Sequence, residues 1–460
     1  MYLNLNPERV AGLTAEEVST LQELINIYHR HLPANNMKNR YYEGKVSLGE
    51  CNLGIALPQG MRGLEIGCAW GAKTVDVLAA RSMFDGFVGA DGAPVDELTA
   101  IVEANNLIAE YPRATRDELK IGCTFATLYK DAKYGCKIRF HSAENAAAIW
   151  DGNKGRIGAG FTIIDEDEDE RESRSASVVY FYTDTAVIVL TRSGKEWTAT
   201  RYAQKMGRPL MEPMIWNATT GKPLGRSRIK EPIRRLIQGY VRTIANATIG
   251  LEFSTAPQKY LLGVSEDMYD ALINDKFKQY VGNLIAATTN PDTGEMPTFG
   301  QLPQGNISPH VEMIRILATQ FSAATGLTVT DTGIVNDANP TSSDAILAQT
   351  QTLVAMAQEL NTGNGDALQT IARMALAISR DITLDELTED DLKIVAHFKN
   401  PAMPSVAVTA DAAIKIASAR ESFAQTDTFL EMIGFSQADI RRIKAQEQRA
   451  RGLALADELA

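Results

Sequence analysis

The stretch NDANPTSSDAILAQ, residues 336–349, decides how the second half of the chain folds, because a polar loop stops there and a long helix starts at once. Its first residues favour turns: Asn336, Asp337 and Asn339. Pro340 disfavours helix at the residue before it, and Thr341 or Ser342 then offers a hydroxyl to the free N–H groups of a helix start. An apolar stripe at helical spacing follows, formed by Ile346, Leu347 and Leu353.

The composition indicates a globular protein with several packed units. Its 460 residues suffice for two to four of them, and 45% of the residues are apolar and 22% charged, which allows a sizeable core. The formal net charge is −11. A protein that grips nucleic acid by its phosphate backbone normally shows a basic face, so the charge argues against that mode of binding.

No targeting or membrane segment is evident. The N-terminal sequence MYLNLNPERV lacks a basic start followed by an apolar run. The longest apolar runs, such as 186–190, are far shorter than the roughly 20 residues that span a bilayer. The cysteines at positions 51, 68, 123 and 136 form neither a CxxC pair nor a zinc spacing. We expect no membrane association, synthesis in a cytoplasm, and buried, reduced thiols.

The first part of the chain begins with helices and continues with strands. Thr14 and Glu17 have the spacing of a capping box, and the helix after them is expected to end near Pro33, with a second short helix closing at YYEG, residues 41–44. Further helices are predicted at 70–84 and 95–110. Alternating, β-branched and aromatic patterns predict strands at 120–131, 133–144, 177–184, 185–192 and 195–204. The acidic run DEDEDERE, residues 165–172, is typical of a solvated loop.

Helices return in the second part. An apolar stripe begins near Ser227 and predicts a long helix. Residues 251–307 are mixed, with a short helix expected at 266–279 and strands around a turn at 290–294. Ser308, as a cap, and Pro309, in the first turn, predict a helix that ends at Gly326.

After a loop at 327–339, the pattern predicts a helix from 341 to 360, an interruption at NTGNGD (361–366), and then more helix. Residues 406–460 are expected to be helical, with a turn at Gly434.

One glycine-rich stretch resembles two kinds of binding motif. GLEIGCAWGAKT, residues 63–74, is similar to the opening motif of methyltransferases and to a phosphate loop, but Ala72 stands where the loop requires its second glycine. No alternation of strands and helices follows. The five histidines form no HExxH motif, and no nucleophile elbow is present. The sequence therefore predicts no catalytic residue, no metal site and no cofactor.

Between Arg315 and Arg373 the chain contains no Lys or Arg, although it contains acidic residues such as Asp331 and Asp337. Two interpretations stay open. The interval can be two buried helices with a neutral loop, or a surface that lies beside a polyanion without holding it, since Lys and Arg contacts to phosphate bind tightly.

Several segments in a fixed order resemble the portal proteins of tailed bacteriophages, the head–tail connector rings of the long-tailed siphophage type. They are YYEG, the strand-rich block 122–201, GRSRIKEPIRRLIQGYVRTIANAT, FSTAPQKYLLGV, LPQGNISPHVEMIRILATQFSAATGL and NPTSSDAI. The last segment is the most specific, because it follows a helix and a loop. Together the segments cover nearly the whole chain.

The resemblance implies an α+β portal fold with seven parts. They are a mixed α/β wing (1–226), a first stem helix (227–250), a small α/β clip (251–307), a second stem helix (308–326), a tunnel loop (327–340), a long wing helix with its return (341–405) and a helical crown (406–460). The implied stem residues are Ile233, Ile237, Val241, Ile314, Leu317 and Phe321. The implied clip residues are Pro257, Tyr260, Phe277 and Pro291. The residues implied to face the DNA channel are Thr328, Thr330, Asp331, Thr332, Asn336 and Asp337.

The same resemblance implies a function without catalysis. The chain would form a ring, usually of twelve subunits, at one capsid vertex of a virion, and double-stranded DNA would pass through it without sequence specificity. The expected partners are the terminase packaging motor, the major capsid protein and the head–tail adaptor. Two alternatives stay open: another ring component of the capsid or tail, or an enzyme that binds a nucleotide or S-adenosylmethionine at Gly67–Thr74.

Overall fold

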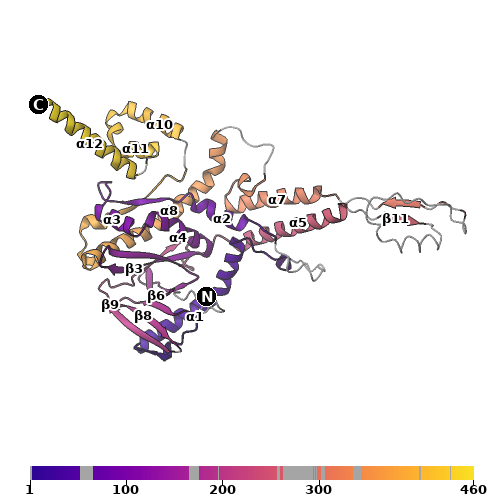
Figure 1. The fold of residues 1–460 in the computed structure, drawn as a ribbon, viewed down its shortest axis with the longest axis horizontal. Coiled ribbons are helices and arrows are strands. Elements are labelled where there is room, and N and C mark those ends of the chain that lie inside the picture. The colour runs from indigo at the N-terminus through magenta and orange to yellow at the C-terminus, as the bar shows by residue number, and fades with distance from the viewer. Residues whose placement is uncertain are drawn as a thin grey trace. The chain divides into compact units, whose positions relative to one another are not determined.

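The computed structural model describes residues 3–51, 66–164, 176–194, 196–255, 259–262, 294, 296, 298–301, 306–334, 343–402, 406–435 and 437–459 (Figure 1). The chain forms two compact units. The first combines Met1–Lys45, Ala69–Arg235 and Phe321–Ala460, and the second combines Val46–Cys68 and Leu236–Gln320. Helices make up 52% and strands 22% of the described structure, which confirms the predicted mixture of helix and sheet. None of the described helices is long and apolar enough to cross a membrane.

Most elements belong to the first unit. Its helices are α1 (Ala15–Tyr42), α2 (Trp70–Ala79), α3 (Asp96–Ala104), α4 (Leu107–Ile121), α8 (Ser343–Arg380), α9 (Glu389–Leu392), α10 (Val406–Ala419), α11 (Asp427–Ile433) and α12 (Gln437–Leu459). Its strands are β1 (Val10–Ala11), β2 (Phe84–Val88), β3 (Cys123–Asp131), β4 (Gly135–Ser142), β5 (Ala146–Asp151), β6 (Arg156–Ile164), β7 (Val178–Tyr182), β8 (Ala186–Ser193), β9 (Glu196–Ala203), β10 (Met211–Ile215) and β13 (Val395–Phe398). Helices α5 (Glu231–Thr255) and α7 (Ser308–Thr325) have residues in both units, and β11 (Lys259–Leu262) and β12 (Thr298–Gln301) belong to the second.

Two sheets form the strand-rich block. The larger has the order β1-β9-β8-β7-β6-β5, and all its pairs are antiparallel except β1 with β9. The smaller, β10-β3-β4, is antiparallel. The five predicted strands are confirmed as β3, β4, β7, β8 and β9. The sequence did not predict β5, β6 and β10 individually, because alanine and glycine in β5 and β6 are poor strand formers.

Each sheet has its own apolar core. Leu21, Leu24 and Tyr28 of α1 pack with the larger sheet, where the rings of Tyr28 and Phe161 lie edge to face with centroids 5.7 Å apart. The smaller sheet packs with α4 and α8 around buried side chains that include Tyr111, Phe125 and Ile371. Burial of large apolar side chains on both sheets supplies most of the driving force for folding.

Helix α1 continues through Pro33, so the predicted end there is wrong. Proline has no N–H, and one bond of the helix is therefore missing. The capping box of Thr14 and Glu17 is confirmed at the start of the helix. Side chains on both sides of the proline donate to backbone carbonyls elsewhere: Tyr28 to Glu144 (3.0 Å), Asn35 to Ala143 (3.2 Å) and Lys38 to Ile121 (3.0 Å). These contacts outweigh the local preference for a break, and YYEG closes α1 itself.

The two helices predicted next have different bounds. α2 stops at Ala79, and the chain enters β2, which pairs with the distant strand β13. The helix expected at 95–110 is two helices, because Asn106 has a φ of +52° between them. The second of these, α4, extends into the segment predicted as strand and ends at Gly122, whose φ is +128°. A Cβ atom there would lie within 3.1 Å of the Arg226 backbone.

Helix α8 is continuous through NTGNGD, contrary to the predicted interruption. Asn364 is fully buried, and its Nδ2 donates to Tyr111 Oη at 3.0 Å and to Glu118 Oε2 at 2.9 Å. Tertiary contacts of residues that usually break helices therefore keep this helix intact.

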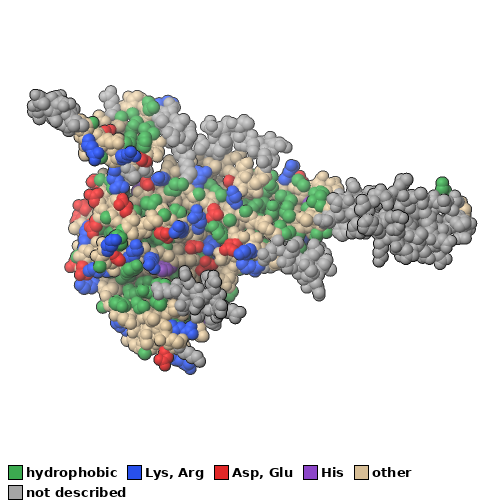
Figure 2. Space-filling model, in the orientation of Figure 1, with side chains coloured by type: hydrophobic (Ala, Val, Ile, Leu, Met, Phe, Trp, Pro, Cys, Tyr) green, Lys and Arg blue, Asp and Glu red, His purple; other side chains and the backbone are tan. Residues whose placement is uncertain are grey.

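In the second unit, α5 and α7 approach each other at Gly239, where a Cβ atom would lie 3.2 Å from Leu317 Cδ2. α5 begins at Glu231 rather than near Ser227. The predicted cap of α7 is also displaced, because Ser308 is already the first residue of the helix, and its N–H donates to Asn306 Oδ1 at 2.9 Å. Figure 2 shows hydrophobic side chains gathered over these helices. On α7, Val311, Met313 and Ile316 are 46%, 44% and 45% exposed.

Some of the remaining expectations fall within the described residues, and others fall outside them. Residues 406–435 and 437–459 are mainly helical, and Gly434 (φ +107°) makes the predicted turn, although a second break falls between α10 and α11. Antiparallel strands β11 and β12 are present in the segment predicted as mixed. The acidic run 165–172, the expected helix 266–279 and most of the expected turn at 290–294 lie outside the described residues.

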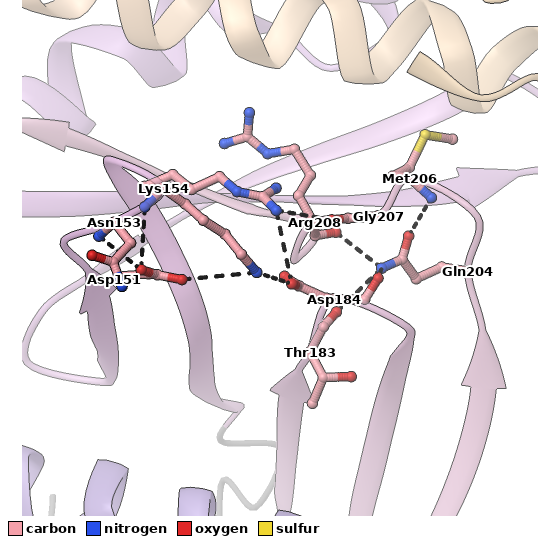
Figure 3. Close-up of polar contacts among 10 residues, drawn as sticks. Asp151, Asn153, Lys154, Thr183, Asp184, Gln204, Met206, Gly207 and Arg208 are labelled. Carbon is pink, nitrogen blue, oxygen red and sulfur yellow. Dashed lines mark hydrogen bonds and ion pairs between the residues drawn. The ribbon is translucent and has the colours of Figure 1, made fainter. Parts of the chain in front are cut away.

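A polar cluster joins three connections of the two sheets (Figure 3). Lys154, after β5, contacts Asp184, after β7, at 2.8 Å. The Gln204 side chain donates to the carbonyls of Thr183, Asp184 and Arg208 and accepts from the Met206 N–H. The guanidinium of Arg156 donates to the Gly207 carbonyl at 2.9 Å. These bonds fix the link between β9 and β10, and hence the position of one sheet on the other.

The buried carboxyl of Glu118 predicts a pH dependence of stability. Burial raises its pKa from 4.5 to about 8. The folded protein therefore binds this proton more tightly than the unfolded chain does. The resulting stabilisation is complete below pH 4.5 and is lost as the pH rises through 8, at up to about 1.4 kcal/mol per pH unit.

We expect Glu118→Gln, which is neutral and of similar shape, to weaken this loss. The measurement is the melting temperature of both proteins at pH 5, 6.5 and 8. Glu110→Gln, at a partly exposed residue of the same helix, is the control and should melt with the wild-type pH dependence. A Glu118→Gln protein whose melting temperature falls as steeply as that of the wild type would show that another group titrates.

Candidate channel loop and its anchor

The turn after α7 is closed by its own hydrogen bonds. Gly326, with a φ of +71°, ends the helix as predicted. The backbone N–H and the hydroxyl of Thr328 both donate to Asp331 Oδ2, at 2.9 and 2.8 Å. A 3₁₀ turn at Thr330–Thr332 follows and ends at Gly333, whose φ is +84°. The carboxylate of Asp331 therefore accepts the two hydrogen bonds that close the turn.

Trp70 of α2 holds this turn in place. Its ring stacks on the ring of Phe321, with centroids 4.7 Å apart and an interplanar angle of 28°. Its Nε1 donates to the carbonyl of Thr332 at 3.3 Å. Both rings are buried. Because a buried indole N–H needs an acceptor, the same side chain satisfies its polar atom and fixes where the turn lies.

A buried arginine joins the start of the turn to two other elements. Arg228 is 5% exposed. Its Nε donates to the Thr74 carbonyl in α2, and its Nη2 donates to the Thr325 carbonyl at the end of α7. Its Nη1 lies 3.3 Å from the Met356 sulfur of α8. One side chain thus holds the end of α7, α2 and α8 together.

The electrostatics of Arg228 are unusual. Burial lowers its pKa to about 10, and no carboxylate in the described part of the chain pairs with it. The carbonyl groups of Thr74 and Thr325 stabilise its positive charge instead. Thr325 lies at the C-terminus of α7, where the helix dipole is negative. A buried charge with dipoles as its only partners is stable only while those dipoles stay in place.

The structure brings together only part of the predicted channel loop. Thr328, Thr330, Asp331 and Thr332 form one folded turn, and the side chain of Thr330 is exposed. Hydrogen bonds within the turn join residues 328–332 to one another. Asn336 and Asp337 lie outside the described residues.

The predicted stem residues lie in α5 and α7. Five of them are buried: Ile233, Ile237, Val241, Leu317 and Phe321. Ile314 is half-buried. Of the predicted clip residues, Tyr260 lies in β11 opposite Gly300. Pro257, Phe277 and Pro291 lie outside the described residues.

Sequence reasoning missed Arg228 and gave Trp70 no role beyond the start of a helix. Arg228 stands in the basic segment GRSRIK, where nothing distinguishes a buried arginine from an exposed one. Whether this arginine is buried depends on its contact partners, which are distant in sequence. For Trp70, the sequence offered one signal of a special role: this tryptophan is followed by a glycine at the start of a helix.

The glycine-rich stretch has a packing role in the structure. A Cβ atom at Gly71 would lie 1.9 Å from the Tyr41 carbonyl oxygen, so glycine allows α1 and α2 to approach. The Thr74 hydroxyl donates to the Trp70 carbonyl at 2.8 Å. It is therefore engaged in its own helix rather than placed for a phosphate or metal. No group of three His, Cys, Asp or Glu side chains that could hold a metal occurs among the described residues.

We expect Arg228→Met to loosen the turn. The change removes the guanidinium donors to the carbonyls of Thr74 and Thr325, which costs about 2–4 kcal/mol of unfolding free energy. Hydrogen exchange of the amides at 326–333 should accelerate. Arg226→Met, two residues away at an exposed position, is the control and should leave both quantities nearly unchanged. Equal effects of the two changes would exclude Arg228 as the residue that holds the turn.

Comparisons with known proteins complete the description. No curated protein matches the chain in sequence. One similar solved structure is a virion of a native gene transfer agent particle, with 11% identity and a TM-score of 0.44, covering 76% of this chain and 86% of that chain. A second is the neck of an empty gene transfer agent particle computed with C6 symmetry, with 10% identity and a TM-score of 0.46, covering 76% of this chain and 86% of that chain. A third is the neck of a native gene transfer agent particle computed with C12 symmetry, with 12% identity and a TM-score of 0.42, covering 80% of this chain and 89% of that chain.

A family model gives the decisive match. The model of the phage portal proteins of the SPP1 Gp6-like type covers residues 21–452, nearly the whole chain. The resemblance inferred from the ordered segments is thereby confirmed. The chain belongs to the SPP1 Gp6-like family of phage portal proteins.

Proposed function

We propose that the chain forms a closed ring of twelve subunits at one capsid vertex, through which double-stranded DNA is packaged and ejected. Membership in the portal family is the observation that carries this proposal, and it makes the chain a virion component. The proposed partners are a terminase packaging motor, the major capsid protein and a head–tail adaptor. DNA passes through the ring without being read in sequence.

The parts of the chain take the roles that the family order suggests. α5 and α7 are the stem, with β11 and β12 in the clip between them. The sheets, α1 to α4 and α8 form the wing, and α10 to α12 form the crown. The order of these elements along the chain supports the assignment.

The exposed apolar side chains of α7 support assembly into a ring. The inward stripe of α5 is covered within the subunit, so that stripe offers little apolar surface to a neighbour. Val311, Met313 and Ile316 remain open on α7. Because the same residues are exposed on every copy, contact with a different surface of the next copy repeats around a ring and closes it.

The turn after α7 supports the role of a channel surface. Thr330 and Gly333 are exposed there, and no Lys or Arg occurs between Arg315 and Arg373. A surface without cations makes few counterion-releasing contacts with phosphate, so DNA slides past it. Trp70 and Arg228 give this surface a fixed base.

The chain itself supplies no catalysis in this proposal. The family is structural, and the packing of Gly71 and Thr74 leaves the glycine-rich stretch no evident nucleotide role. We therefore assign the energy of DNA movement to a separate motor.

We expect Ile316→Asp to prevent ring formation, because a carboxylate at an apolar contact loses its hydration without a partner. Sedimentation velocity of the purified chain should show rings for the wild type and monomers or small oligomers for the variant. Leu392→Asp, at an equally exposed apolar residue (46%) in the first unit, is the control and should form rings. Normal rings of Ile316→Asp would remove α7 from the interface.

We expect Thr330→Lys to leave rings intact and to slow DNA packaging. It adds one cation per subunit without disturbing the bonds of Asp331, and each cation gains a phosphate contact that must break as DNA moves. The measurement is the packaging rate in a reconstituted motor assay at several salt concentrations, where high salt should restore the rate. Asn153→Lys, at an exposed turn of the larger sheet, is the control. Similar rates for both variants would exclude this turn as the channel surface.

A further inference from the structure

The first unit contains a large pocket that neither the stem nor the loop uses. Its volume is about 800 Å³, within the range of ligand-binding clefts. It lies between α1, the start of β3, the start of β5 and the segment 222–234. All its lining residues belong to one unit of one subunit, so the pocket does not depend on ring formation.

The pocket is lined mainly by positively charged side chains, although the whole chain has a negative net charge. The complete sequence has 46 basic and 57 acidic residues. Among the described residues, the pocket is lined by Lys38, Lys222, Arg226, Lys230 and Arg234, against Glu231 as the one acidic side chain. Glu231 pairs with Arg235, which lies outside the lining. Within the described residues, Lys222, Arg226 and Lys230 form no ion pair.

One of these cations, Lys38, is partly buried and held in place by hydrogen bonds. The Nζ of Lys38 donates to the Ile121 carbonyl at 3.0 Å and to Asn35 Oδ1 at 3.3 Å. Burial lowers the pKa of Lys38, and the charges of Arg234 and Lys222 lower it further. Like charges thus repel one another around the pocket, and an anionic ligand would relieve that repulsion.

The wall below the charges is apolar. It is formed by side chains of α1, β3, β5 and the segment before α5, namely Ile27, Phe125, Ala147, Leu224 and Ile229. Phe125, Ala147 and Ile229 are themselves buried, whereas Ile27 and Leu224 are half-buried, and an ion alone would leave these two side chains in contact with water. A ligand that carries both carboxylates and an apolar group would cover the wall and neutralise the rim.

We propose that this basic pocket binds an acidic segment of another protein that inserts an apolar side chain between its acidic residues. Charge complementarity and the apolar wall carry the proposal. DNA fits the site less well, because the phosphates of a duplex lie on a convex surface and have no apolar group for the wall. A recessed cation such as Lys38 would stay beyond their reach.

The test uses the full-length protein and a fluorescein-labelled peptide of aspartate and glutamate with a central phenylalanine. Fluorescence anisotropy should show binding that weakens with added salt. A peptide with lysine in place of the acidic residues should not bind, and serine in place of phenylalanine should weaken binding. The variant Lys222→Glu with Lys230→Glu should lose about tenfold or more in affinity.

The control variant is Lys73→Glu with Lys205→Glu, which changes the charge equally at exposed residues outside the pocket. It should bind the peptide as the wild type does, and both variants should keep the wild-type melting temperature. The proposal fails if the peptide does not bind the wild type, or if both variants bind it equally. It also fails if a DNA duplex displaces the peptide with equal affinity, or if binding appears only after residues 165–172 are replaced by glycine and serine, since the chain's own acidic run then fills the pocket.

Discussion

The position of the channel turn depends on one buried guanidinium group. Arg228 is placed by its own backbone, whose N–H donates to the Leu119 carbonyl at 2.8 Å, and by the neighbouring Ser227, whose hydroxyl donates to the Lys120 carbonyl at 2.5 Å. From there its side chain reaches α2, the end of α7 and α8. Because an unpaired buried charge is costly, this arrangement permits few alternatives. The base of the turn is therefore rigid.

A second buried polar group, the side chain of Asn364, fixes the position of the other half of α8. Asn364 is buried against Tyr111 and Glu118, so α8 cannot slide along or rotate about its axis without breaking bonds in a region without water to replace them. Apolar packing alone tolerates small shifts, whereas buried hydrogen bonds do not. The stiffness of this long helix thus comes from polar contacts, although its stability comes mainly from apolar burial.

Local signals predicted much of the fold, and distant contacts explain the errors. The capping box at Thr14, the glycine stop at Gly326 and the five β-branched strands depend on neighbouring residues, and all were predicted. The continuity of α1 through Pro33 and of α8 through Asn364 depends on partners far along the chain. The pairing of β2 with β13 does so too. For the candidate site, sequence located the turn but not Arg228, because burial of a charged residue has no local signature.

The two-residue strand β1 has a consequence for solubility. It runs parallel to β9 at the edge of the larger sheet and covers the start of that strand, where Val10 pairs with Trp197 and Ala11 with Thr198. The bidentate contact of Arg201 with Glu17 ties the start of α1 to the same strand. Without β1, the backbone groups of Trp197 and Thr198 would lie open to any extended chain, and open edges are where sheets of different molecules join. A very short N-terminal segment thus shortens the stretch of open strand at which two molecules can join.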